Sequence, residues 1–247
     1  MGLLSNIKKE PLSVNPREMI IFSYPKIGKT ELMTHLPGDY LILDFDDGMA
    51  YYSGSYIKIP DYKTFGEVCK EFNQEKPHFR FIVIDTVTML NDNIANSIAI
   101  RNYNKDPMNA KNQIKDEKFD ITNLAYGAGY GYKRNALQQA INFFKPFCET
   151  LIILGHVADK ALKTGKDDEG NVKDLALEGK LKDILALKTD AMGLLYRSSM
   201  NENSISFNPS IGLIGGTRIP HLANQDFVIS EKQDDGTLVT YWDRIFK

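Results

Sequence analysis

The sequence predicts an α/β fold with a mostly parallel central sheet flanked by helices, and a small C-terminal β-hairpin or tail. Two observations lead to this prediction. Short apolar segments alternate along the chain with segments whose apolar residues recur at helical spacing. Polar or acidic residues also follow directly after several apolar segments, where parallel strands would end. With 247 residues, the chain suits one large domain, or one domain with a small appendage.

The composition is that of a folded globular protein. Hydrophobic residues make up 43% and charged residues 25%, which excludes disordered, collagen-like and coiled-coil chains. The net charge of -2 gives no global positive field, so any nucleic-acid binding must use a local patch. The two cysteines, Cys69 and Cys148, form no zinc-binding cluster, and we expect a reducing cytoplasmic location. No apolar run approaches the length of a membrane span, so we expect no membrane association.

The first half of the chain contains three successive strand-helix units. Each predicted strand is a short apolar run, and Asp85 directly follows the third. The segment after the first strand contains Pro25 and Gly28, which indicate a turn. We expect strands at 18–23, 40–45 and 81–84, and helices at 29–36, after Asp61 and from Val87 to Ile98.

Two long polar stretches interrupt this alternation in the second half. Residues 101–132 predict a long connection, and residues 158–179 predict a flexible hairpin or disordered loop. Between them we expect an amphipathic helix that Pro146 ends, and then a buried strand. We expect this buried strand at 150–154 and further elements at 180–187, 191–197 and 204–207. The chain as a whole is predicted to consist of an N-terminal arm (1–16), a core (17–222) and a C-terminal tail (223–247).

The most specific motif is a phosphate-binding loop of the form G-x-x-x-x-G-K-T in which serine replaces the first glycine. An apolar strand precedes it and a helix follows, as this motif requires. Backbone N–H groups would face a polyphosphate, while the lysine reaches the terminal phosphates and the threonine hydroxyl binds magnesium. The motif therefore predicts a site for ATP and Mg²⁺. Its residues are Ser23, Tyr24, Pro25, Lys26, Ile27, Gly28, Lys29 and Thr30.

Three polar residues at strand ends complete the candidate catalytic set with Lys29. Asp85 is expected to hold Mg²⁺ through a water, beside Thr30 as the second metal-binding residue, and it also suits a helix N-cap. Asp46, just past the second strand, is the candidate for orienting the attacking water; the alternative is an acidic turn in solvent. His156 ends the fourth strand, where it would sense the terminal phosphate or serve as an ordinary polar residue.

The segments 41–46, 82–86 and 151–156 resemble the corresponding strands of RecA-like ATPase cores. Over residues 17–222 the chain is similar to compact phage-encoded RecA-like ATPases associated with single-strand annealing and recombination. The matching residues include Gly-Lys-Leu-Lys at 179–182 and the pairs Thr189-Asp190 and Thr217-Arg218. The resemblance implies a RecA-like P-loop NTPase core that hydrolyses Mg-ATP in an infected bacterial host.

The chain departs from the RecA pattern at three site positions. Ser23 replaces glycine, Asp46 replaces the expected glutamate and His156 replaces glutamine. The shorter Asp46 side chain would lie about one methylene further from the water, which predicts slow hydrolysis.

The resemblance further implies that the two polar stretches contact single-stranded DNA. Cations follow a phosphate backbone while aromatic faces stack on bases, although the tyrosines could instead pack on their own domain. The implied DNA-binding residues are Arg101, Tyr103, Lys105, Tyr126, Tyr130, Tyr132, Lys133, Arg134 and Lys163, with Lys111, Lys115 and Lys118 nearby.

A ring or filament of identical subunits is also implied, with a cation from the neighbour completing the nucleotide site and a single-strand binding protein as a further partner. The candidate cations are Lys160, Lys180, Lys182, Arg197 and Arg218.

Two other function classes are compatible with the motif. Phosphate-binding loops also serve small-molecule kinases, which need an acceptor pocket and an arginine-rich lid. A non-hydrolysing, nucleotide-gated interaction protein is compatible with Ser23 and Asp46. ATP hydrolysis that single-stranded DNA stimulates would distinguish the RecA-like ATPase hypothesis from both alternatives.

Overall fold

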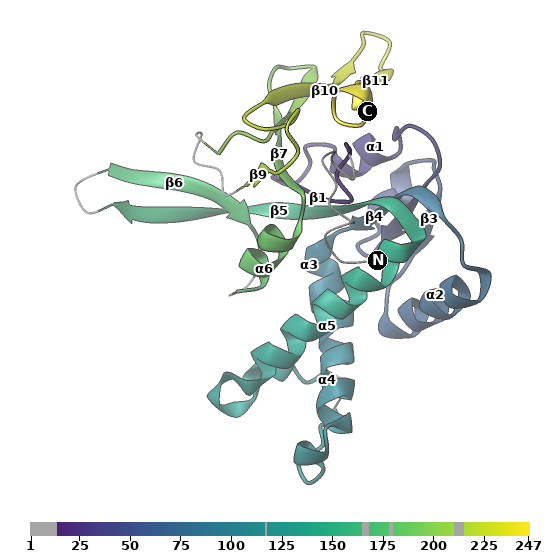
Figure 1. The fold of residues 1–247 in the computed structure, drawn as a ribbon, viewed down its shortest axis with the longest axis vertical. Coiled ribbons are helices and arrows are strands. Elements are labelled where there is room, and N and C mark those ends of the chain that lie inside the picture. The colour runs from purple at the N-terminus through teal and green to yellow at the C-terminus, as the bar shows by residue number, and fades with distance from the viewer. Residues whose placement is uncertain (1–13, 117, 165–167, 178–179, 210–214) are drawn as a thin grey trace, which may run out of the picture.

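The computed structural model describes residues 14–247 except 117, 165–167, 178–179 and 210–214, and the side chains of 160–172 also lie outside the description. A parallel sheet forms the centre of the molecule (Figure 1), which confirms the predicted α/β fold. Its strands, in spatial order, are β7 (Ala191–Arg197), β1 (Glu18–Ser23), β5 (Cys148–Thr164), β4 (Phe79–Asp85), β2 (Tyr40–Asp44) and β3 (Tyr56–Lys58).

Two apolar cores lie on the two faces of this sheet. Side chains alternate along β1, so Ile20 and Phe22 join one core while Met19 and Ile21 join the other. The first core contains residues of α2 (Tyr62–Glu75), α4 (Asn96–Lys105) and α5 (Ala128–Phe144). The second contains Leu32 and Met33 of the short helix α1 (Lys29–Met33), which we expected to reach residue 36; the chain continues to Leu36 in turns.

The C-terminal residues extend the sheet. We expected a hairpin partner for the 191–197 strand at 204–207 and a small C-terminal β-hairpin or tail. β8 (Glu202–Ser206) is that partner, and β10 (Asp226–Lys232) and β11 (Leu238–Thr240) form a C-terminal hairpin. All three strands continue the central sheet in antiparallel order, which we did not expect, and β9 (Gly216–Thr217) pairs with β7. A 3₁₀ turn at Trp242–Arg244 then packs into the second core, where the Phe246 ring lies 4.8 Å from that of Phe81. Short strands with interspersed polar residues concealed this pairing in the sequence.

The first polar stretch is α-helical at both ends. A continuous run of α3 (Val87–Met89), a π-helical segment (Leu90–Ala95) and α4 reaches Lys105, and α5 begins at Ala128. Figure 1 shows α4 and α5 extending away from the sheet side by side. We call α4, α5 and their connection at 106–127 the arm. Three 3₁₀ turns lie in this connection, at Pro107–Asn109, Ile121–Asn123 and Ala125–Gly127.

The long connection predicted at 101–132 is present but shorter, at 106–127, because α4 and α5 extend into both ends of the stretch, and two residue types explain the difference. Asparagine suggested a loop, yet Asn104 exchanges two hydrogen bonds of 2.8 Å with the backbone of Ile114 and so fixes the connection against α4. Glycine suggested a loop too, yet Gly129 lies inside α5 at a close contact: a Cβ there would meet the Ile121 carbonyl oxygen at 1.6 Å.

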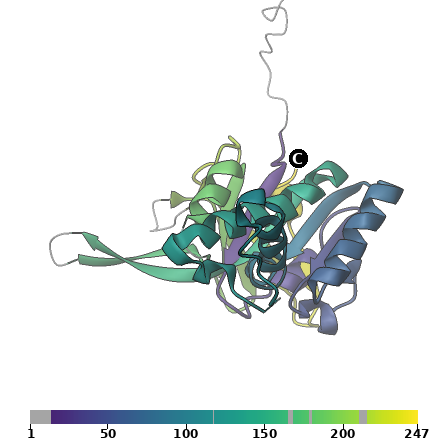
Figure 2. The ribbon, with the colours of Figure 1, turned by 90° about the horizontal axis from the view of Figure 1, so that it is seen from below.

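The second polar stretch is an antiparallel hairpin, one of the two predicted alternatives. β5 continues past the parallel sheet and pairs with β6 (Asp168–Leu175), and the pair projects from the body (Figure 2). The helix α6 (Leu181–Lys188) follows. Of the predicted N-terminal arm, residues 1–13 lie outside the described residues. Among the helices that the structure describes, none combines the length and apolar character needed to cross a bilayer.

Candidate nucleotide-binding site

Strand register brings the predicted site residues to one edge of the sheet. Ser23 at the end of β1 lies opposite His156 on β5, and Asp44 at the end of β2 lies opposite Asp85 on β4. The carboxyl ends of these four neighbouring strands thus meet where ligands bind in open α/β sheets. This agrees with the expectation that phosphate-binding and acidic residues converge there.

The loop between β1 and α1 has the backbone of an anion-binding turn. Lys26 and Gly28 adopt left-handed conformations, with φ of 64° and 99°. Left-handed residues within a turn direct successive N–H groups into a concavity that binds anions. Gly28 tolerates this conformation because it has no Cβ.

Lys29 lies at the centre of this turn. Its side chain is buried, and Nζ donates hydrogen bonds to Ser23 Oγ at 2.9 Å and to the Tyr24 carbonyl at 3.4 Å. Burial lowers the pKa of Lys29, although Asp85 and Asp46 partly oppose the shift. Among the described residues no carboxylate forms an ion pair with this ammonium. A bound phosphate would supply the anionic partner.

Ser23 shows what serine provides in place of the usual glycine. Its hydroxyl accepts the hydrogen bond from Lys29 and donates to the Tyr24 carbonyl at 2.7 Å. The substitution therefore adds a buried group that positions the lysine side chain.

Thr30 and Asp85 form the candidate metal site. Thr30 Oγ1 donates to Asp85 Oδ2 at 2.6 Å, and the Asp85 side chain is buried. Burial raises the pKa of Asp85 to about 7, against the lowering effect of the Thr30 hydrogen bond, and the charges of Asp46 and Asp44 add to the rise. Hydroxyl and carboxylate oxygens are the ligands that Mg²⁺ prefers, and a cation would offset the cost of burying this carboxylate. The residues present therefore fit Mg²⁺.

Asp46 lies beside this pair on the segment after β2. Its side chain is exposed, and Oδ1 accepts from the Gly48 N–H at 3.2 Å. Solvent reaches this side chain, but the surrounding residues desolvate it in part, and this desolvation together with the charge of Asp44 raises the pKa of Asp46. A Cβ on Gly48 would lie 3.1 Å from Asp46 Oδ1 and 3.2 Å from Thr30 Oγ1, so glycine there allows the two side chains to approach.

The sequence did not identify the role of Asp44. This carboxylate is fully buried and accepts the N–H groups of Gly48 at 3.0 Å and Met49 at 3.1 Å. It fixes the turn that carries Asp46. An acidic residue that still belongs to a buried strand is the one signal that the sequence contained.

His156 lies next to Lys29. Its Nδ1 lies 3.5 Å from Lys29 Nζ, and burial together with the Lys29 charge lowers the pKa of His156. The imidazole is therefore neutral at physiological pH. A neutral ring next to Lys29 can exchange hydrogen bonds with a terminal phosphate without adding charge.

A second contact, which no sequence motif predicts, links the site to the hairpin. The Tyr24 hydroxyl donates to Asp159 Oδ1 at 2.7 Å, and Lys173 Nζ lies 5.6 Å from the centre of the Tyr24 ring. This hydrogen bond raises the pKa of Tyr24. Because Asp159 and Lys173 belong to β5 and β6, the phosphate-binding loop touches the base of the hairpin.

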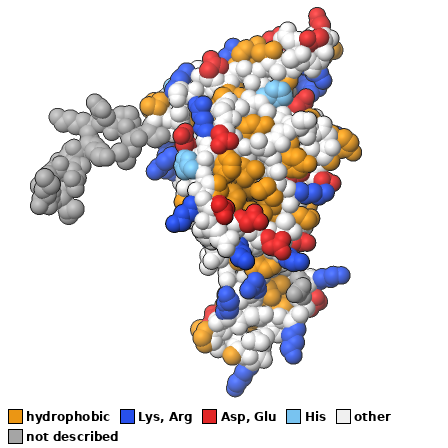
Figure 3. All heavy atoms as spheres, turned by 90° about the vertical axis from the view of Figure 1, so that its right-hand side faces the viewer, with side chains coloured by type: hydrophobic (Ala, Val, Ile, Leu, Met, Phe, Trp, Pro, Cys, Tyr) orange, Lys and Arg blue, Asp and Glu red, His pale blue; other side chains and the backbone are white. Residues whose placement is uncertain are grey.

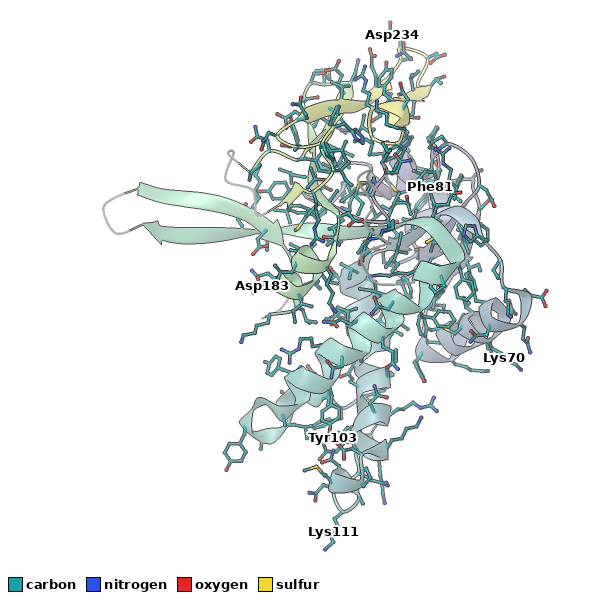
Figure 4. The ribbon with its side chains drawn as sticks, viewed as in Figure 1. Lys70, Phe81, Tyr103, Lys111, Asp183 and Asp234 are labelled. Carbon is teal, nitrogen blue, oxygen red and sulfur yellow. The ribbon has the colours of Figure 1, made fainter. Side chains whose placement is uncertain are left out.

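The structure divides the predicted DNA-binding residues into separate groups. Tyr103 lies inside the arm, as Figure 4 shows, with its ring 5.4 Å from that of Tyr132. Lys133 is also buried, whereas Tyr126 and Tyr130 are exposed. The rest are distributed as follows: Arg101 and Lys105 border a groove beside α2, Arg134 borders a small hollow with Lys180, and the side chain of Lys163 lies outside the described residues.

The candidate cations for a neighbouring subunit also differ in environment. Lys182 forms an ion pair with the buried Asp174, and Arg218 donates a hydrogen bond to the Leu187 carbonyl, so both have partners within the chain. Lys180 and Arg197 are exposed. The side chain of Lys160 lies outside the described residues.

Comparison with known families agrees with this geometry. Residues 15–219 match a family described as an AAA domain. No curated protein matches the chain. AAA domains bind nucleotide, typically with Mg²⁺, and generally hydrolyse ATP. The match covers most of the chain and contains the whole constellation of Ser23, Lys29, Thr30, Asp85 and His156. The chain therefore belongs to the AAA domain family and has a P-loop ATPase-type domain.

Proposed function

We propose that the protein is a RecA-like, Mg-ATP-hydrolysing enzyme that acts on single-stranded DNA in recombination or replication, by annealing or strand pairing in a phage-infected bacterium. The nucleotide site described above supports the ATPase part. The observation that carries the DNA part is the surface of the arm, which combines unpaired cations with exposed tyrosines.

Three carboxylates of the arm accept hydrogen bonds from other residues of the arm. Asp106 accepts from the Tyr132 hydroxyl at 2.7 Å, Asp116 from the Lys118 N–H at 2.9 Å and Asp120 from the Thr122 N–H at 2.9 Å. By contrast, no ion pair in the described part of the chain involves an arm cation. Lys and Arg side chains gather over the lower end of Figure 3, where the arm lies, and Figure 4 shows Lys111 at its end. The arm therefore presents a local basic patch despite the acidic net charge.

Two tyrosines near the start of α5 add stacking surfaces. Tyr126 is fully exposed and Tyr130 is half exposed. Tyr126 also adopts a left-handed conformation, with φ of 57°, which costs a non-glycine residue about 1–3 kcal/mol. The Tyr126 ring faces solvent, so no packing of this ring against the described residues offsets the cost. Exposed aromatic rings beside cations are the combination that binds single strands without sequence preference.

The first prediction concerns this surface. Replacing Tyr126 and Tyr130 together by alanine is expected to weaken binding of a labelled oligo-dT by at least about tenfold, since each stacked base contributes roughly 1–3 kcal/mol. Anisotropy titrations at several salt concentrations measure the affinity and its salt dependence. Tyr56→Ala, at an exposed tyrosine on β3, is the matched control. The proposed DNA surface would be contradicted if the affinity for oligo-dT did not depend on salt and the double variant bound as tightly as wild type.

The second prediction concerns Asp46. Asp46→Asn is expected to reduce the ATP turnover rate by about 10²–10⁴-fold and to leave nucleotide affinity within a factor of a few, because a carboxamide cannot accept the proton of an attacking water. The wild-type rate itself is expected to be slow and to rise with single-stranded DNA. Asp234→Asn, at an exposed position on the turn between β10 and β11 that is labelled in Figure 4, is the control. A variant that hydrolyses ATP as fast as wild type would remove Asp46 from the catalytic set.

Self-association and partner binding form the remaining part of the proposal. The nucleotide site has no arginine among its described contacts, and a neighbour's cation in a ring or filament would supply one. Arg197 and Lys180 are the candidates that are exposed and have no ion-pair partner among the described residues. A single-strand binding protein is the partner that such an enzyme would meet on DNA.

A further inference from the structure

We propose that the groove between α2 and the arm binds an acidic peptide segment of a partner protein, which inserts one large apolar side chain. This surface is separate from the nucleotide site and from Tyr126 and Tyr130. The proposal goes beyond the ATPase and DNA-binding functions and does not depend on them.

The groove has an apolar floor and a volume of about 270 Å³. Phe65 and Cys69 of α2, Ile98 of α4, and Ala140 and Phe143 of α5 form this floor. Pockets that enclose a whole small-molecule ligand typically measure roughly 300–1,000 Å³. The groove lies near the lower end of that range and has room for one large inserted side chain, with the rest of the ligand lying across the rim.

Gly66 gives independent support for a ligand at this groove. It lies in the fifth position of the 14-residue helix α2, where glycine weakens a helix relative to alanine. The fold does not require glycine there: its φ is not left-handed, and an added Cβ would meet nothing within 4 Å. Gly66 also lines the groove. A residue that disfavours the helix but keeps the groove open is expected where another molecule approaches the backbone.

The charges around the groove favour an acidic occupant. Arg101 and Lys105 lie at the rim, and no carboxylate lines the groove. The Arg101 guanidinium is held in place because Nη1 donates to the Tyr62 hydroxyl at 2.6 Å and the group lies 5.4 Å from the centre of the Tyr62 ring. Neither rim cation forms an ion pair with a described residue. An arginine oriented in this way can receive a carboxylate through its other N–H groups.

These charges distinguish between possible occupants. The chain's own residues 1–13 contain Lys8 and Lys9 but only one acidic residue, Glu10, so they match a cationic rim poorly. A nucleic acid matches the charge, yet it would leave the apolar floor without a matching side chain. An acidic peptide with an apolar residue satisfies both features.

The test uses a fluorescein-labelled decapeptide in which aspartates flank a single phenylalanine, titrated with the full-length protein. We expect saturable binding that weakens at least about tenfold when serine replaces the phenylalanine or asparagine replaces the aspartates. Gly66→Leu is expected to weaken binding at least about tenfold without lowering the melting temperature, because the new side chain fills the groove and leucine favours a helix. Arg101→Gln is expected to weaken binding and to reduce its salt dependence.

Matched controls separate this outcome from nonspecific effects. Gly131→Leu changes another helical glycine whose Cβ would meet nothing, and Lys70→Gln changes a cation on α2 that points away from the arm in Figure 4; both should bind the peptide as wild type does. Absence of peptide binding, or Gly66→Leu binding as tightly as wild type, would overturn the proposal. If oligo-dT displaces the peptide and binds Gly66→Leu more weakly than wild type, the groove binds nucleic acid and not an acidic peptide.

Discussion

Asp85→Asn is expected to make the protein more stable at pH 8 and to reduce ATP hydrolysis at least roughly 10²-fold. Burial raises the pKa of Asp85 from 3.8 to about 7. The folded state therefore holds this proton more tightly than the unfolded state, so the carboxylate makes the protein less stable as pH rises from about 4 to about 7. Asparagine has no charge to bury. The shift corresponds to an upper limit of about 4 kcal/mol, and we expect a gain of about 2–4 kcal/mol at pH 8.

Urea unfolding in EDTA at several pH values measures this effect. The gain in unfolding free energy should be largest at pH 8 and should disappear near pH 4, where wild-type Asp85 is protonated. Asp234→Asn, at an exposed position, should change stability little at either pH. The loss of hydrolysis follows because an amide cannot hold Mg²⁺ beside Thr30 as a carboxylate does. An Asp85→Asn protein that is less stable at pH 8 and still hydrolyses ATP would contradict both parts.

Lys29→Ala is expected to lower the affinity for ATP by about 30–1,000-fold. The ammonium lies buried in the turn, held by Ser23 and 3.5 Å from His156, so it is already positioned for a phosphate. A charge-assisted hydrogen bond contributes roughly 1.5–3 kcal/mol, and a buried lysine can make more than one. Titration with a fluorescent ATP analogue measures the loss.

Two controls complete this experiment. Lys70→Ala removes an exposed cation far from the turn and should leave the affinity unchanged. Circular dichroism should show that Lys29→Ala folds, because removing a desolvated ammonium imposes no buried unpaired charge. Equal affinities of Lys29→Ala and wild type would show that the nucleotide binds elsewhere.

The sheet and its site could be predicted because local signals agreed with each other. The runs before Ser23, Asp46, Asp85 and His156 are short and apolar, and the parallel arrangement alone brings their ends together. The phosphate-binding motif then fixed which edge of the sheet carries the chemistry. An error of a residue or two in a predicted strand boundary still places the residue after the strand at the same edge of the sheet, so approximate boundaries were enough to predict the site.

The full length of the arm helices and the addition of β10 and β11 to the central sheet could not be predicted, because the contacts that stabilise them are long-range or polar. Asn104 holds the connection through hydrogen bonds to Ile114, which leave no apolar periodicity in the sequence. Gly129 looks like a loop residue until its contact with Ile121 is known. Trp242 and Phe246 belong to the second core through contacts with segments far away in the sequence.

The site details that the sequence missed depend on how different elements approach one another. Asp44 supports the Asp46 turn through backbone N–H groups, and the Tyr24–Asp159 hydrogen bond joins a loop to a strand 135 residues away. Such pairs have no fixed spacing, so no motif describes them. The Tyr24–Asp159 hydrogen bond connects the turn at 23–30 to the hairpin through β5, which also carries His156.

A crystal structure with a non-hydrolysable ATP analogue and Mg²⁺ tests the central claim most directly. We predict that the phosphates lie in the turn from Ser23 to Thr30 with the Lys29 ammonium against them, and that the metal ion lies at Thr30 and Asp85. Phosphates bound elsewhere, or a metal ion that neither Thr30 nor Asp85 contacts directly or through a water, would contradict the account.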